Sequence, residues 1–256
     1  MRNSTLILVF FISMHLSAQK AAIDEFIFDS SITEQYSSSF SEIISVMADY
    51  YKGVEYSDEE LLNGAFHSEW HMRDNDGTNN QSIHIEDKPT FIKRVKNHGD
   101  YKDYANHRKI GAVEVVHDQL AFVRIDKAPT RSATLFFLAK IDEVWSIIDK
   151  LWVYQEENYK PLPSNELLST IESFYADKQP MDKGFDSMQF SNNSYQTFQD
   201  SNVVDEEIKL VSTLGIYDRL AVVRTDYPIL NTAAYLVLFR LDSGWKVACE
   251  RISTRN

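Results

Sequence analysis

The chain has 256 residues and a formal net charge of −12, with 38 acidic residues against 26 basic ones. This balance argues against a nucleic-acid partner, because phosphate binding relies on clustered lysine and arginine. The single cysteine, Cys249, excludes a disulfide framework and a thiolate metal cluster. The length suits two domains of about 100–150 residues each.

The first 18 residues, 1–18, are expected to be a signal peptide. Arg2 gives a positive start, an apolar run extends from Leu6 to Leu16, and a Ser-Ala pair precedes the cleavage point at Gln19. An apolar run this short does not span a bilayer, which needs about 20 residues. An uncleaved anchor is the alternative. We therefore expect a periplasmic or secreted protein that makes no membrane contact after cleavage.

An amphipathic helix opens the first predicted domain. Its apolar positions recur at helical spacing; they are Phe40, Ile43, Ile44, Met47, Tyr50 and Tyr51. We expect Ser39 and Glu42 to form a capping box at its start and Gly53 to end it. Ser57 is expected to cap a short second helix that ends at Gly64.

A strand and a third helix follow, and then an antiparallel meander. The strand is expected at 65–73 and the helix at 87–97, with Pro89 in the first helical turn. Four further segments are rich in β-branched and aromatic residues, which are typical of strands. They cover residues 105–116, 120–126, 133–141 and 145–154.

The second half of the chain repeats this meander. Residues 118–152 align with 218–252 at a constant offset of 100 without a gap, and ten of the 35 positions are identical. An amphipathic helix begins after Ser164, and a polar segment at 181–205 replaces most of the short elements of the first half. The pattern predicts two copies of one fold. The linker between them is expected at 155–163, which contains two prolines.

Several short motifs of the first half are distinctive. They are Ala65-Phe66-His67, Ile85-Glu86-Asp87 before Phe91-Ile92, Ala121-Phe122-Val123, Phe136-Phe137-Leu138, and Trp145 through Lys150. Together they resemble the putative lumazine-binding family of the nuclear transport factor 2-like superfamily. The resemblance covers residues 38–154 well and 164–254 in part. It implies an α+β fold of two cone-shaped, cystatin-like domains, each a curved antiparallel sheet with helices packed on its concave face.

The same resemblance implies a small-molecule ligand and a pairing of sheets either within the chain or in a homodimer. No cofactor is expected. The wider superfamily includes ketosteroid isomerases as well as non-catalytic modules, so the fold does not decide the function. Three functions are therefore open. They are an exported small-ligand-binding protein, an isomerase or dehydratase that uses a pocket carboxyl and a histidine, and a structural or protein-interaction module.

Asp149 is the candidate catalytic carboxyl, with His67 or His71 as its partner. Strict alternation places Asp149 on the same face of its strand as Trp145 and Ile147. Burial on an apolar face would raise the pKa of this carboxyl and suit it to proton transfer. The alternative is that Asp149 faces a solvated rim or pairs with a nearby cation. No further residue completes a catalytic constellation.

Aromatic residues are the candidates for binding a flat heterocycle by stacking. The predicted ligand-binding set is Tyr50, Phe66, His67, Trp70, Asp149 and Trp152. The alternative is that these aromatics form an ordinary core. No metal site is expected, because His67 and His71 on a strand lie about 13 Å apart. Cys249 is expected to be a buried apolar residue, with a reactive thiol as the alternative.

Overall fold

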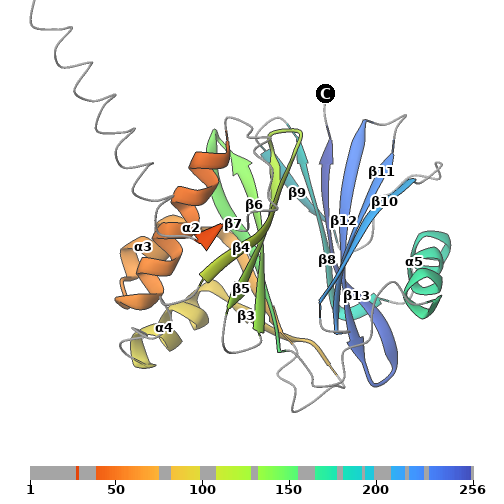
Figure 1. Ribbon diagram of the computed structural model, residues 1–256, viewed down its shortest axis with the longest axis horizontal. Coiled ribbons are helices and arrows are strands. Elements are labelled where there is room, and N and C mark those ends of the chain that lie inside the picture. Colours follow the sequence, from red (N-terminus) through yellow and green to blue (C-terminus); the bar gives the residue numbers. More distant parts are fainter. Residues whose placement is uncertain are drawn as a thin grey trace, which may run out of the picture.

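Two β-sheets lie face to face in the computed structural model, and helices cover their outer faces (Figure 1). The structure describes residues 27–28, 39–74, 82–98, 108–127, 132–154, 165–177, 181–191, 194–198, 209–216, 219–227 and 231–254. The expected signal peptide and linker, 1–18 and 155–163, lie outside these residues. No helix in the described ranges is long and apolar enough to cross a membrane.

The first sheet has seven strands in the order β1-β4-β5-β6-β7-β2-β3. They are β1 (Ile27–Phe28), β2 (Phe66–Asp74), β3 (His84–Asp87), β4 (Arg108–Val116), β5 (Leu120–Lys127), β6 (Ser132–Ile141) and β7 (Val144–Tyr154). The meander from β4 to β7 is antiparallel, as expected. In contrast, β2 pairs with β7 in parallel and β1 pairs with β4 in parallel, so the whole sheet is mixed.

Three helices cover this sheet: α2 (Phe40–Glu55), α3 (Glu59–Ala65) and α4 (Lys88–His98). The expected capping box is wrong, because the Ser39 hydroxyl donates to Asp118 and makes no cap hydrogen bond. Asp58, not Ser57, caps α3 by accepting from two backbone N–H groups. Gly53 lies inside α2, where an added Cβ would lie 2.7 Å from the Leu62 side chain. Its role is therefore to let α3 approach α2 closely.

The second sheet has six strands in the order β10-β11-β12-β13-β8-β9. Its elements are α5 (Asn165–Asp177), β8 (Met181–Ser191), β9 (Ser194–Phe198), β10 (Lys209–Ile216), β11 (Leu220–Tyr227), β12 (Thr232–Leu241) and β13 (Gly244–Thr254). The polar segment at 181–205 thus contains two strands. They pair as β2 and β3 do in the first sheet: β8 is parallel to β13, and β9 is antiparallel to β8.

Strand pairing in the two sheets coincides at an offset of 100 residues. Leu120 faces Ala139 as Leu220 faces Phe239. The register also shifts at the same place, after Phe137 in the first sheet and after Val237 in the second. The two domains therefore share one topology, and equivalent positions can be compared directly.

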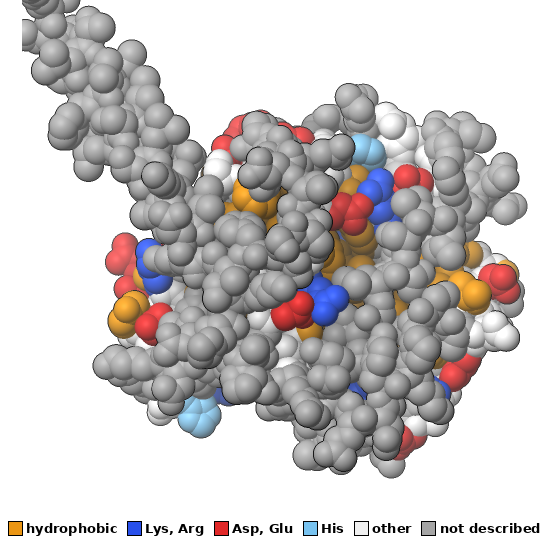
Figure 2. Space-filling model, viewed as in Figure 1, with side chains coloured by type: hydrophobic (Ala, Val, Ile, Leu, Met, Phe, Trp, Pro, Cys, Tyr) orange, Lys and Arg blue, Asp and Glu red, His pale blue; other side chains and the backbone are white. Residues whose placement is uncertain are grey.

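The inner faces of the two sheets share one hydrophobic core. Tyr235 of β12 contacts Phe137 and Phe122 of the first sheet, with ring centres 5.4 and 6.3 Å apart. Separate cores lie under α2 to α4 and under α5. In Figure 2, described acidic and basic side chains on this side of the molecule lie next to one another and form no large patch of one sign. The sheets thus pair within the chain. Likeness to the family's dimer, and formation of a homodimer, stay predictions.

Candidate functional site

A β-bulge in β7 decides which side chains face the helices. Ile148 is an extra residue there, because Ile147 and Asp149 face neighbouring residues of β6. Trp145 and Ile147 pack in the core under the helices, whereas Ile148 and Leu151 pack between the sheets. The bulge breaks the alternation on which the placement of Asp149 depended. The expectation that Asp149 shares a face with Trp145 and Ile147 is therefore wrong.

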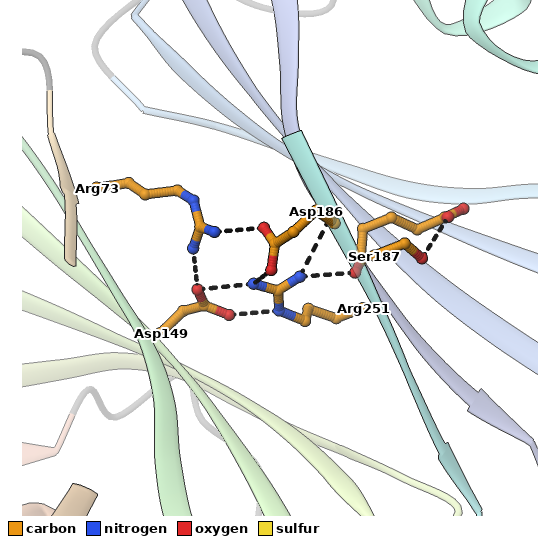
Figure 3. A network of polar contacts seen from close by, with 6 residues as sticks. Arg73, Asp149, Asp186, Ser187 and Arg251 are labelled. Carbon is orange, nitrogen blue, oxygen red and sulfur yellow. Dashed lines mark hydrogen bonds and ion pairs between the residues drawn. The ribbon is translucent and has the colours of Figure 1, made fainter. Parts of the chain in front are cut away.

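Asp149 points toward the second sheet, where it pairs with two arginines (Figure 3). Its carboxylate is fully buried and accepts from Arg251 through Nε at 2.5 Å and Nη2 at 2.9 Å. It also accepts from Nη1 of Arg73. Asp186 of β8 accepts from the same two arginines, with Arg251 Nη2 at 3.0 Å. We call Arg73, Asp149, Asp186 and Arg251 the inter-sheet ion network.

The inter-sheet ion network balances two negative charges with two positive ones. Each domain supplies one arginine and one aspartate, and both arginines are almost completely buried. Buried charges are tolerated only when they are paired and hydrogen-bonded. The alternative reading of Asp149, pairing with a nearby cation, is therefore correct. Both of its oxygens are occupied by guanidinium groups, an arrangement that suits a structural role.

Acid is expected to destabilise the protein partly through Asp186. Burial alone would raise the pKa of this carboxyl, but the charges of Arg251 and Arg73 outweigh burial and lower it. A carboxyl whose pKa is lower in the folded state than in the unfolded state stabilises the fold at pH values above its unfolded-state pKa of about 3.9. That contribution is lost as the pH falls through the folded-state pKa. The measurement is the free energy of unfolding by urea at a series of pH values between 7 and 3. Asp186→Asn should make this free energy depend less on pH. The same pH dependence in the variant and the wild-type chain would contradict the prediction.

The candidate histidines lie on the side of the sheet that faces the second domain. His71 is the register partner of Asp149 on β2, but its Nδ1 is buried and has no hydrogen-bond partner in the part of the chain that the structure describes. The His67 ring contacts Tyr195 of β9 edge-on, with ring centres 4.9 Å apart. Burial lowers the pKa of His67 and outweighs the opposing charge of Glu69. Neither histidine donates to Asp149.

The candidate aromatics gather on the opposite face, under the helices. Phe66 and Trp70 have ring centres 4.3 Å apart, and Tyr50 lies 5.5 Å from Phe66. All three side chains are at most 3% exposed and belong to the helix-side core. The predicted ligand-binding set is therefore split, with His67 and Asp149 on the other face. The half-buried Trp152 lies two residues along β7 from Lys150.

Lys150 is the residue that sequence reasoning missed. The bulge turns it toward the helices, where its Nζ lies 4.9 Å from the ring centre of Phe91 and 5.7 Å from that of Tyr50. Its exposed fraction is only 9%. The buried indole N–H of Trp70, in the same core, has no hydrogen-bond partner within the described ranges. We call Lys150, Tyr50, Trp70 and Phe91 the Lys150 site.

A hollow lies on the outer surface between α3 and α4. It has a volume of about 520 Å³, and its lining includes Glu59, Lys88, Lys93 and Lys96. Lys96 pairs with Glu59 at 2.6 Å, and Lys88 donates to the carbonyl of Phe66 at 2.9 Å. Two of its three lysines are thus already engaged, and the hollow is open to solvent. It provides a control location for ligand experiments.

Cys249 lies beside the inter-sheet ion network on β13. The thiol is fully buried, and burial raises its pKa to about 12. The expectation of a buried apolar residue is confirmed, and a reactive thiol is not supported. Among the described residues, no group of three histidine, cysteine or acidic side chains is placed to hold a metal ion.

Residues 38–153 match the model of the family described as "Putative lumazine-binding". The first domain belongs to that family. The matched residues include Lys150 and Asp149, whereas Asp186 and Arg251 lie beyond them. The Lys150 site thus lies wholly within the matched residues, and the inter-sheet ion network only in part. Among curated proteins, none matches the chain.

Several solved structures are similar to parts of the chain. A nuclear transport factor 2-like (NTF2-like) protein of unknown function from Shewanella baltica is 18% identical, covers 47% of this chain and 97% of its own, and has a TM-score of 0.36. One from Methylobacillus flagellatus is 20% identical, with 46% and 94% covered and a TM-score of 0.39. A domain with a cystatin-like fold from Nostoc punctiforme is 15% identical, with 56% and 88% covered and a TM-score of 0.35. The expected fold class, two α+β domains of this superfamily, is confirmed.

Proposed function

We propose that the protein is an exported small-ligand-binding protein and that its first domain binds a flat heterocycle at the Lys150 site. The observation that carries the proposal is the buried ammonium group of Lys150 above the ring of Phe91. Ligand sites are mostly apolar and contain a few polar groups that fix orientation. Here a cation and the indole N–H of Trp70 are set among aromatic rings.

The chemistry of the Lys150 site favours a ligand with carbonyl oxygens or a negative charge. A lysine offers donors only, and the indole N–H of Trp70 is also a donor. A flat ring would stack on the aromatic side chains while its oxygens accept from Lys150 and Trp70. Lumazine is such a molecule, and the description of the family supports it as the first ligand to test.

Lumazine is expected to bind the mature chain and to quench the fluorescence of Trp70. Lys150→Met should weaken binding by about tenfold to a hundredfold, because hydrogen bonds to charged groups contribute about 1.5–3 kcal/mol. The matched control is Lys93→Met, which removes a lysine from the hollow between α3 and α4 and should leave affinity unchanged. If Lys93→Met loses lumazine binding and Lys150→Met does not, lumazine binds in that hollow and not at the Lys150 site.

Export is tested on protein purified from its own source. A native mass spectrum should give the mass of a chain that begins at Gln19 and retains a small molecule that leaves on denaturation. A mass that includes residues 1–18 would contradict export by signal cleavage. A bare mature chain that also fails to bind lumazine would contradict the ligand proposal.

A structural or protein-interaction role is the second candidate. It is favoured by the close ring contacts of Tyr50, Phe66 and Trp70, which are the contacts of a filled core. A ligand at the Lys150 site would have to displace part of this packing. The isomerase or dehydratase alternative is not favoured, because the carboxylate of Asp149 is held by two arginines.

We also infer that the second domain arose as a copy of the first. Support comes from the sequence identities at an offset of 100 and from strand registers that coincide at the same offset. This origin makes Lys150 and residue 250 equivalent positions.

A further inference from the structure

The hollow between α3 and α4 has a lining rich in lysine. The two helices lie next to each other on the outer side of the first sheet (Figure 1). The volume of the hollow, about 520 Å³, is within the range of small-molecule sites, about 300–1,000 Å³. Residues three or four apart share one face of a helix, so α4 turns several lysines toward α3. The lining includes Glu59 of α3 and Lys88, Pro89, Ile92, Lys93 and Lys96 of α4.

The lining of this hollow carries an excess of positive charge. Three lysines lie there with one glutamate, whereas in the whole chain acidic residues outnumber basic ones 38 to 26. Lys96 pairs with Glu59 at 2.6 Å. Within the ranges that the structure describes, no carboxylate pairs with Lys88 or Lys93. The hollow thus offers an anion two cations whose charge is not already balanced by a described acidic side chain.

The ammonium group of Lys88 is held in place at the end of α3. Its Nζ donates to the carbonyl of Asn63 at 3.1 Å and to that of Phe66 at 2.9 Å. An ammonium group has three N–H donors, so one remains for a ligand. Burial lowers the pKa of Lys88, and a bound anion would offset this cost of desolvation. Binding to the helix end explains Lys88 but not Lys93, which is exposed on the same side of α4.

We propose that this hollow is a second small-molecule site, which binds an organic carboxylate with a compact apolar group. The carboxylate of the ligand accepts from Lys88 and Lys93. Its apolar group contacts Pro89 and Ile92, which lines the hollow and is only 6% exposed. Ligand sites combine such apolar surface with a few polar groups that fix orientation. The inference goes beyond the proposed function, because the hollow shares no residue with the Lys150 site.

The experiment uses the whole mature chain and two probes of similar shape, cyclohexanecarboxylate as the anion and cyclohexylammonium as the cation. Neither ring is flat, so neither probe suits stacking at the Lys150 site. Binding is followed by NMR of the isoleucine methyl groups. Cyclohexanecarboxylate should shift the signal of Ile92 in a saturable way, with a dissociation constant in about the millimolar range. Cyclohexylammonium should leave that signal unchanged.

Lysine variants then locate the bound anion. Lys93→Met should weaken cyclohexanecarboxylate binding by about threefold to fivefold, as expected for an exposed charge pair. Lys88→Met should weaken it by about tenfold, because its ammonium group is partly buried and fixed. Two controls should leave the affinity unchanged. They are Lys150→Met and Lys246→Met, which removes a lysine of β13 in the second domain.

Glu59→Gln should tighten cyclohexanecarboxylate binding by about threefold, because it releases Lys96 to the hollow. Its matched control is Glu143→Gln, which removes the same charge from the partly exposed pair with Lys140, outside the hollow. An equal gain of affinity in both variants would show that only the net charge of the chain matters, and it overturns the proposal.

The test stays decisive if Lys88→Met fails to fold. Lys93 is exposed and has no partner among the described residues, so Lys93→Met should keep the fold. Absence of a saturable shift at Ile92, or equal affinity of Lys93→Met and the wild-type chain, overturns the proposal. Weaker cyclohexanecarboxylate binding in Lys150→Met overturns it as well. The Lys150 site is tested by lumazine, so each proposal can fail without the other.

Discussion

Replacement of Arg251 by methionine is expected to lower the free energy of unfolding by about 3–5 kcal/mol. The change leaves two carboxylates, the fully buried Asp149 and the mostly buried Asp186, with one arginine between them. Methionine fills much of the same volume, so the loss measures the uncompensated charge more than a cavity. Urea unfolding at neutral pH is the measurement.

The matched control is Arg224→Met. Arg224 also reaches across the sheets, to Glu114, but this pair is partly exposed. Exposed pairs contribute about 0–1 kcal/mol. A second variant replaces Arg73 and Asp149 together, which leaves the pair of Asp186 and Arg251 intact. Its free energy of unfolding should fall by less than that of Arg251→Met. Equal losses for Arg251→Met and Arg224→Met would show that the buried network does not depend on charge balance.

Trp70→Ala is expected to destabilise the fold by about 3–5 kcal/mol, the range for large aromatic truncations in a packed core. The Trp70 ring contacts Phe66 and Phe91 and is only 1% exposed. Trp152→Ala is the control. It should lower the free energy of unfolding by clearly less, because the Trp152 side chain is only half-buried. Thermal and urea unfolding give both values. A loss below about 1 kcal/mol for Trp70→Ala would indicate that its ring borders an open cavity.

The elements were largely predictable from the sequence, because their signals are local and repeated. The strands of both meanders are rich in β-branched and aromatic residues, which predict strands. The alignment at an offset of 100 supports the same strands in both halves. The strands within 181–205 were missed, since Ser, Asn, Asp and Gln dominate there and their pairing with β13 is nonlocal. Gly53 was taken as a helix end because its contact with Leu62 cannot be seen in sequence.

The candidate site was less predictable, and one residue explains most of the difference. Ile148 is as typical of a regular strand as Ile147, so nothing local marks the bulge. Without the bulge, Asp149 would face the helices and Lys150 the second sheet. The true arrangement depends on arginines from β2 and β13, far away in the chain.

The charges of the inter-sheet ion network are distributed unequally over equivalent strands. Arg73 of β2 corresponds to Met188 of β8, and Arg251 of β13 corresponds to Leu151 of β7. In a twofold homodimer, every substitution appears twice across the axis. Here both sheets belong to one chain, so a substitution changes the interface once. The two halves can therefore acquire complementary partners one residue at a time, as two different proteins in a heterodimer do, without ever having to find each other in solution.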